Sequence, residues 1–173
     1  MVGKLLPCFY IQGKETHVGQ CFEGLDASMI AAELVHRIHL NHDFIDEYEG
    51  EYTYPPSVLK MKDLKPWYNV QTTGEALVYF NYFVHNATID EITDKLKKAA
   101  EEVKETILER TRREIEWFSA KSGNNISMQD YNCKVMTYKE LYEKVSKTKG
   151  FSEEEMHRRM DNEQAFTNPE GMG

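Results

Sequence analysis

Residues 75–91 read EALVYFNYFVHNATIDE and contain the two clearest structural signals in the chain. Residues 77–84 are almost continuously apolar and aromatic, which is typical of a buried central strand. Thr88 and Glu91 follow with the spacing of a capping box, in which each side chain hydrogen-bonds to the other residue's backbone N–H. These signals predict a strand over residues 75–85 and a helix that begins at Thr88.

The helix after Thr88 is long. Its apolar positions recur at helical spacing, and we expect it to continue to about residue 121, which corresponds to a length of ~50 Å at 1.5 Å per residue. That length exceeds the width of a small sheet, so its C-terminal part is expected to pack on another segment. The apolar positions are Ile92, Leu96, Ala99, Val103, Ile107, Ile115 and Phe118.

The sequence before residue 75 predicts three more elements. Residues 4–12 form a strand with an irregularity at Pro7, because proline donates no hydrogen bond to a sheet. Asp26 is the N-cap of a helix that reaches about residue 40. The acidic segment 41–56 reads as an exposed loop, and residues 58–61 follow as a short strand.

After the long helix, residues 131–138 are predicted as a last strand, and 138–147 and 152–162 as short helices. The order is therefore βαββαβ. It predicts an α+β, ferredoxin-like fold, with a four-stranded antiparallel sheet, two helices on one face and a C-terminal helical extension. The fold covers residues 1–138, and residues 139–173 form a helical or partly disordered extension. Because many unrelated functions use this fold, it does not identify the function.

Composition excludes some partners. The net charge of −8 argues against nucleic acid and against an anionic membrane surface as the main partner. No apolar run approaches the ~20 residues of a membrane span. The three cysteines, Cys8, Cys21 and Cys133, have no metal-ligand spacing and are interpreted as reduced thiols of a cytoplasmic protein.

Residues 13–27, GKETHVGQCFEGLDA, contain the most informative candidate site. His17 lies in a glycine-punctuated loop between a strand and a capped helix, and glycines allow such a loop to turn tightly and present a side chain. A histidine in a loop is most often an ordinary surface residue, so this pattern alone leaves both interpretations open.

The segment resembles the lid motif of the M20 metallopeptidase family. In that motif a strand ends in glycine, a histidine follows after three residues, and Gly-x-Asn-Ala opens the first helix. The matching positions here are Gly13, His17, Gly24 and Ala27. Two positions depart: Cys21 stands where proline is usual, and Asp26 stands where asparagine is usual. The chain is most similar to the arginine-utilisation (RocB-type) subgroup, through residues 13–19, 70–72 (VQT) and 79–83 (YFNYF).

This resemblance implies that the chain is the lid and dimerisation domain of a longer hydrolase. In the family, a separate catalytic domain holds two zinc ions and hydrolyses a peptide or acyl-amino acid. The lid domain interrupts that catalytic domain, forms a homodimer, and lends one histidine in trans to stabilise the oxyanion of the transition state. His17 matches that histidine. The chain is then not catalytic alone, it holds no metal itself, and zinc is expected in the missing catalytic domain.

The resemblance also points to substrate-binding residues. Other lids of the family carry an arginine on the third strand that grips the substrate carboxylate. The matching position is Asn81, which cannot form a charged bidentate contact. An asparagine that precedes that strand in the family corresponds to Asn69 or Gln71. For each of these residues a purely structural amide is the alternative interpretation.

Other combinations of reactive residues are weaker. His36, His39 and His42 lie three residues apart, but these positions drift around a helix and do not converge as zinc ligands must. Cys21 and His17 lack a third group that would activate the thiol. The alternative to an M20-type lid is a free-standing ferredoxin-like module that binds a ligand or acts as a regulator. A natural reading frame that continues on both sides with metal-ligand motifs would exclude that alternative.

Overall fold

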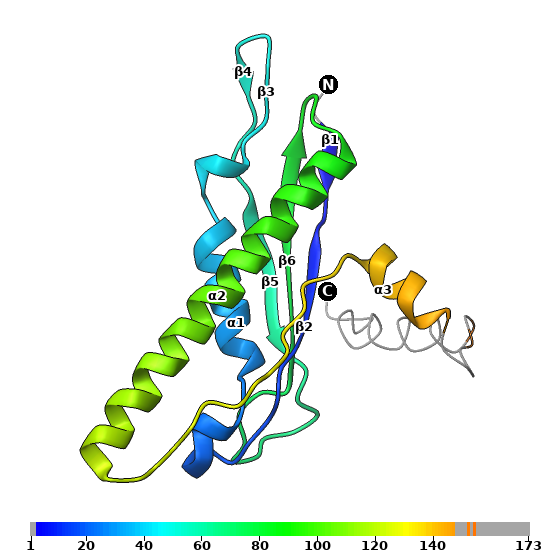
Figure 1. Ribbon diagram of the computed structural model, residues 1–173. Helices are drawn as coiled ribbons and strands as arrows, with labels where there is room; N and C mark the ends of the chain where they lie inside the picture. Colours follow the sequence, from blue (N-terminus) through cyan, green and yellow to red (C-terminus); the bar gives the residue numbers. More distant parts are fainter. Residues whose placement is uncertain (1–2, 148–151, 153, 155–173) are drawn as a thin grey trace. The chain divides into compact units, whose positions relative to one another are not determined.

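The computed structural model describes residues 3–147, 152 and 154 of this chain (Figure 1). The chain divides into two compact units, with the boundary between Val135 and Met136. The first unit contains the sheet and the two main helices, and the second contains α3 (Tyr138–Val145). The short helix expected over residues 138–147 is therefore confirmed, while the helix expected over 152–162 lies almost entirely outside the described residues.

The sheet has four antiparallel strands and is built around β6 (Glu75–Val84). β5 (Ser57–Asp63) pairs with one side of β6, while β1 (Gly3–Leu5) and β2 (Cys8–Gln12) pair with the other. β1 and β2 are two parts of one N-terminal segment that is interrupted at Pro7, whose carbonyl accepts the N–H of Phe80 at 3.1 Å. The irregularity expected at Pro7 is confirmed.

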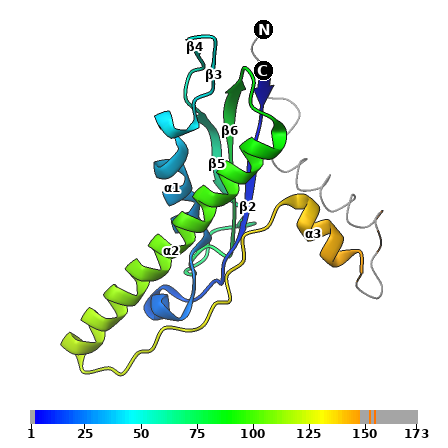
Figure 2. The same cartoon turned by 45° about the horizontal axis from the view of Figure 1, so that its top comes forward.

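Two helices, α1 (Ala27–Ile38) and α2 (Ile89–Ser122), lie over the same face of the sheet (Figures 1 and 2). Both start as predicted. The Asp26 carboxylate accepts the N–H of Ser28 at 2.7 Å. Thr88 and Glu91 form the reciprocal capping box, with backbone-to-side-chain distances of 2.8 and 3.2 Å. The α+β class, with a four-stranded antiparallel sheet and helices on one face, is confirmed.

The core lies between this face and the helices. Alternate side chains of β6 point toward α1 and α2 and are almost completely buried, as the two-residue period of a strand requires. Phe9 on β2 meets Phe80 edge to face, with ring centroids 6.1 Å apart. The buried core side chains of β6 and the helices are Ala76, Val78, Phe80, Tyr82, Ala27, Ala31, Leu34, Ile38, Ile92, Leu96, Ala99, Val103 and Ile107.

The C-terminal part of α2 extends past this core and packs on the loop between β2 and α1. Ile115 is buried, and the Phe118 ring lies 5.5 Å from the Phe22 ring. This contact is the expected second packing site of the long helix. It matters for the site below because Phe22 belongs to the loop that carries His17.

Two local predictions were wrong. The strand expected over residues 131–138 does not form, because Asn132 has a φ of +41°, which breaks the extended backbone, and α3 starts at Tyr138. The sheet still has four strands because the predicted first strand is split into β1 and β2.

Residues 41–56 are also more ordered than a loop: they contain η2 (His42–Phe44) and a hairpin of β3 (Glu47–Tyr48) and β4 (Glu51–Tyr52). Phe44 is buried in the core.

Asp46 fastens this hairpin to the turn between β6 and α2. Its carboxylate accepts the backbone N–H groups of His85, Asn86 and Ala87 at 2.8, 2.8 and 2.9 Å. Burial alone would raise the pKa of Asp46, but these N–H groups outweigh it and hold the pKa below its ordinary value. The pKa of Tyr82 is raised to about 12 by burial and by the negative charge of Asp46.

The lowered pKa of Asp46 predicts how stability changes with pH. Because the folded pKa lies below the unfolded value of about 3.9, the stabilisation is present above that value and is lost as pH falls through the folded pKa. Asp46→Asn should lower the free energy of unfolding by about 1–2 kcal/mol near neutral pH, and this difference should disappear in acid. Urea unfolding between about pH 2 and about pH 7 measures it.

The matched control for this experiment is Asp94→Asn, at an exposed aspartate in the second turn of α2. This variant should follow the wild-type curve. A constant difference between wild type and Asp46→Asn at every pH would contradict the role given to the charge.

Candidate functional site

The loop that carries His17 is closed at its base by backbone pairing. Lys14 and Leu25 exchange two backbone hydrogen bonds, both of 2.8 Å. A Cβ on Gly13 would lie 2.1 Å from the carbonyl oxygen of Leu25, and a Cβ on Gly24 would lie 2.6 Å from that of Lys14. The two glycines are therefore required by the close approach of the chains at the base of the loop.

The pairing of β2 with β6 continues past the strand ends into this loop. Gly13 donates its N–H to Gly74 at 2.7 Å, and further along His17 lies directly opposite Gln71. Gln12 pairs with Glu75, so six residues on one side, from Gln12 to His17, face five on the other, from Gln71 to Glu75. One extra residue of this kind is a β-bulge, which changes the direction of the side chains beyond it.

His17 and Gln71 form a non-hydrogen-bonded pair. The bonds on either side of them run from the N–H of Val18 to the carbonyl of Val70 (3.0 Å) and from the N–H of Thr72 to the carbonyl of Thr16 (2.8 Å). In such a pair the Cα atoms are about 4.5 Å apart and the two side chains lie on the same face. The imidazole and the Gln71 amide are therefore neighbours, and both residues are exposed.

One nitrogen of the His17 ring has a defined role. Nδ1 accepts the backbone N–H of Gly19 at 3.0 Å, and a neutral imidazole whose Nδ1 accepts must carry its proton on Nε2. Among the described residues Nε2 has no hydrogen-bond partner. The loop thus holds a hydrogen-bond donor that is exposed and fixed in tautomer.

The far side of the loop is held by two other segments. Phe22 packs against Phe118 of α2, as described above. The Tyr131 hydroxyl donates to the carbonyl of Gly24 at 2.9 Å and lies 3.3 Å from that of Phe22. These contacts restrain a loop that would otherwise be anchored only at its base.

The two candidate amides near His17 have different roles in the structure. Gln71 lies beside the imidazole. The Asn69 side chain instead accepts the Gln71 N–H at 3.1 Å and so shapes the turn before it. Lys65, which the sequence did not single out, donates a hydrogen bond from its ammonium group to the Gln71 carbonyl.

Asn81 lies elsewhere. It pairs with Ser57 of β5 and is six residues beyond Glu75 along β6, which places it about 20 Å from the loop end of the strand. It is buried, and its Oδ1 has no hydrogen-bond partner within the described part of the chain. The structure therefore brings His17, Gln71 and Asn69 together and leaves Asn81 apart.

In the part of the chain that the structure describes, the remaining histidines and cysteines form no common site. Within the described ranges, no three His, Cys, Asp or Glu side chains are placed to hold a metal ion. His39 accepts the N–H of Val58 at 3.2 Å, and its neighbours His36 and His42 are exposed. The three cysteines are free. In the same ranges no helix is long and apolar enough to cross a membrane. The cytoplasmic location stays a prediction.

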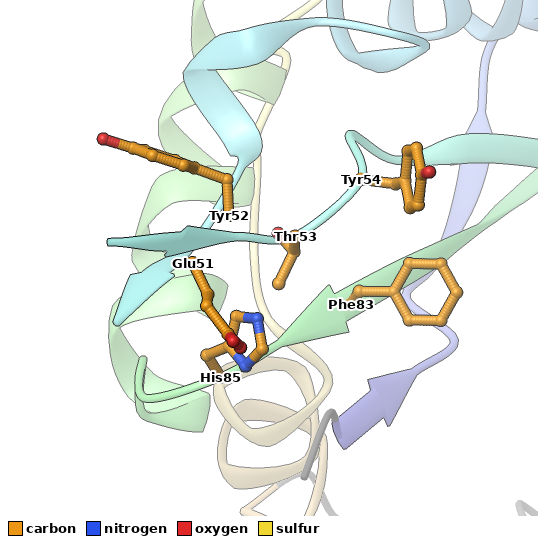
Figure 3. Close-up of a pocket in the computed structure, with 6 residues that line it drawn as sticks. All are labelled: Glu51, Tyr52, Thr53, Tyr54, Phe83 and His85. Atoms are coloured by element: carbon orange, nitrogen blue, oxygen red, sulfur yellow. The ribbon is translucent and has the colours of Figure 1, made fainter. Parts of the chain in front are cut away.

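A hollow lies at the opposite end of β6 (Figure 3). Phe83, in its wall, is eight residues beyond Glu75, or about 27 Å along the strand. The hollow has a volume of about 510 Å³ and is open to solvent. Tyr54 and Phe83 lie on one side of it and Glu51 and His85 on the other, while Tyr52 points away. Sequence reasoning missed it because residues 51–54 read as an exposed loop.

Comparison with known proteins gives two relatives from Bacillus subtilis. The chain is 45% identical over 100 residues to a protein named RocB, and this match covers 58% of the chain and 18% of RocB. It is 35% identical over 154 residues to an uncharacterized protein, YqjN, covering 89% of the chain and 28% of YqjN. No family model matches the chain. The chain is thus related to RocB, and it spans less than a third of the length of either relative.

Proposed function

We propose that this chain is the lid and dimerisation domain of a zinc-dependent M20-type amidohydrolase and that it supplies His17 in trans to the active site of a neighbouring subunit. The observation that carries the proposal is the His17 ring, which is exposed and held with its proton on Nε2. The relation to RocB supports the RocB-type, arginine-utilisation assignment made from residues 13–19. The chain is not catalytic alone under this proposal.

His17 acts as a hydrogen-bond donor in this mechanism. When the carbonyl of a peptide or acyl-amino acid becomes tetrahedral, its oxygen gains negative charge, and a donor that is already oriented stabilises that charge. The Gly19 N–H keeps Nδ1 as an acceptor, so Nε2 needs no rearrangement to donate. Zinc, held by the catalytic domain outside this chain, supplies the activation of water.

Gln71 is the second residue of this chain that we place against the substrate. Its amide lies on the same face as the imidazole and can donate to a carbonyl or carboxylate oxygen. We assign this contact to Gln71 because Asn81 is buried and remote from His17, and because the Asn69 side chain is already bonded to the backbone. Gln71 thus binds substrate from the position that matches the asparagine preceding this strand in other lids.

Replacing His17 in the full-length hydrolase tests the proposal. His17→Ala should lower kcat by about 10²–10³, the cost of removing one oxyanion donor in other enzymes. Folding and zinc content should not change. The control is His42→Ala, at an exposed histidine of η2, which should leave kcat unaltered.

The trans arrangement is tested by mixing His17→Ala with a variant that lacks its zinc ligands. Hybrid dimers combine an intact zinc site with an intact His17 and should recover part of the activity. If His17→Ala keeps wild-type turnover, or if folded hybrids remain inactive, His17 is an ordinary loop residue.

The homodimer is proposed to form through β5. Within the described residues β5 pairs only with β6, so its outer edge presents unpaired backbone groups that can pair with a twin across a two-fold axis. Leu59 and Met61 on this strand are 52% and 44% exposed. The same pairing places α1 of both copies near the interface.

Lysine on an edge strand opposes pairing with another strand. The full-length hydrolase should sediment as a dimer at micromolar concentration, and the double variant Leu59→Lys, Met61→Lys should sediment as a monomer. Leu6→Lys, at an exposed leucine between β1 and β2 on the other side of β6, is the control for added charge. A dimer that survives both β5 substitutions would contradict this geometry.

A further inference from the structure

The loop between β5 and β6, residues 64–74, carries two large exposed aromatic side chains. Trp67 is 72% exposed and Tyr68 is 90% exposed. Val70 on the same loop and Val18 beside His17 are also more than half exposed, at 52% and 56%. We call these four residues the aromatic tip. Figure 1 shows that the loop lies at the same end of the sheet as the loop that carries His17.

The aromatic tip is anchored at its base. Leu64 donates its N–H to Glu75 at 2.9 Å, and the N–H of Lys65 donates to the Asp63 carboxylate at 3.1 Å. The Lys65 ammonium bonds to the Gln71 carbonyl and so joins the two ends of the loop. Trp67 and Tyr68 are therefore presented on a closed loop.

The aromatic tip is also continuous with the site. The N–H of Val18 donates to the carbonyl of Val70, which joins the two loops one residue away from the His17–Gln71 pair. The apolar surface of the tip therefore lies directly beside His17 and Gln71. Exposed Trp and Tyr side chains beside a functional residue are typical of the centre of a protein interface, where each buries about 150–250 Å².

We infer that the aromatic tip docks on the catalytic domain of the neighbouring subunit and seals the site around His17. This inference rests on the proposed function.

Three points indicate that the partner of the aromatic tip is a catalytic domain. The chain spans only 18% and 28% of its two relatives, so most of such a protein lies outside it. The four residues of the tip carry no charge and suit an apolar partner. A donor to an oxyanion stabilises it far more where water is excluded, and Trp67 and Tyr68 are placed to exclude water.

The test compares the solvent accessibility of these side chains in two proteins, the 173-residue chain and the full-length hydrolase, by hydroxyl-radical footprinting. Oxidation of Trp67 and Tyr68 should be high in the chain and severalfold lower in the full-length protein. Tyr52 and Tyr54 are internal controls, since they are 67% and 81% exposed and lie on or beside the β3–β4 hairpin, at the other end of the sheet from the tip (Figure 1). They should be oxidised equally in both proteins.

Each outcome decides the inference. If Trp67 and Tyr68 are as reactive in the full-length protein as in the chain, the docking surface does not exist, even when His17→Ala abolishes turnover. If they are protected in the chain alone as its concentration rises, a second copy of the chain is the occupant and the inference is overturned. If they are protected only in the full-length protein while His17→Ala remains active, docking stands and the proposed function fails.

Discussion

The backbone of Gly13 lies between two other backbone segments, and there is no room for a side chain there. Its N–H reaches the carbonyl of Gly74 at 2.7 Å, and a Cβ would lie 2.1 Å from the carbonyl oxygen of Leu25. This close approach brings three parts of the chain together: the end of β2, the start of α1 and the segment before β6. Without it the pairing that orients His17 could not form, because that pairing continues the β2–β6 ladder through Gly13.

The close approach at Gly13 determines the position of His17. The ladder carries one extra residue past Gly13, and the bulge places His17 opposite Gln71. The Gly19 N–H then sets the tautomer of the imidazole. The core beneath is made of ordinary apolar contacts between β6 and two helices, and its role is to hold the loop end of the sheet in one register. The opposite end is fixed separately, by Asp46 and the hairpin.

Much of the fold could be predicted from local signals. Asp26, Thr88 and Glu91 marked the helix starts because capping depends on side chains within three residues. Pro7 marked the break in the first strand for an equally local reason. The strand expected over residues 131–138 failed because its pattern gave no sign of the positive φ at Asn132. The burial of Phe44 and the hairpin after it depend on distant contacts, which the acidic character of residues 41–56 concealed.

The site was less predictable than the fold. His17 could be singled out from the glycines around it and from its resemblance to a known motif. Its pairing with Gln71 joins residues more than fifty positions apart, and no local pattern encodes such a bridge. Asn81 was predicted as a substrate contact because it matches the arginine position on the third strand of other lids. In the structure it is buried, and the length of β6 separates it from His17. The exposure of Trp67 and Tyr68 likewise depends on a loop closed by Lys65, which sequence alone did not reveal.

Amide hydrogen exchange in Gly13→Ala tests most directly whether the base of the loop holds His17 in place. Val18 and Thr72 donate the two hydrogen bonds that flank the His17–Gln71 pair. Both amides should be protected in the wild-type chain and exchange rapidly in Gly13→Ala, with a loss of about 1–3 kcal/mol in the free energy of unfolding from the overpacked base. Gly74→Ala is the matched control, because a Cβ there has no neighbour closer than 3.6 Å and protection should persist. Protection of Val18 and Thr72 that survives in Gly13→Ala would contradict the account.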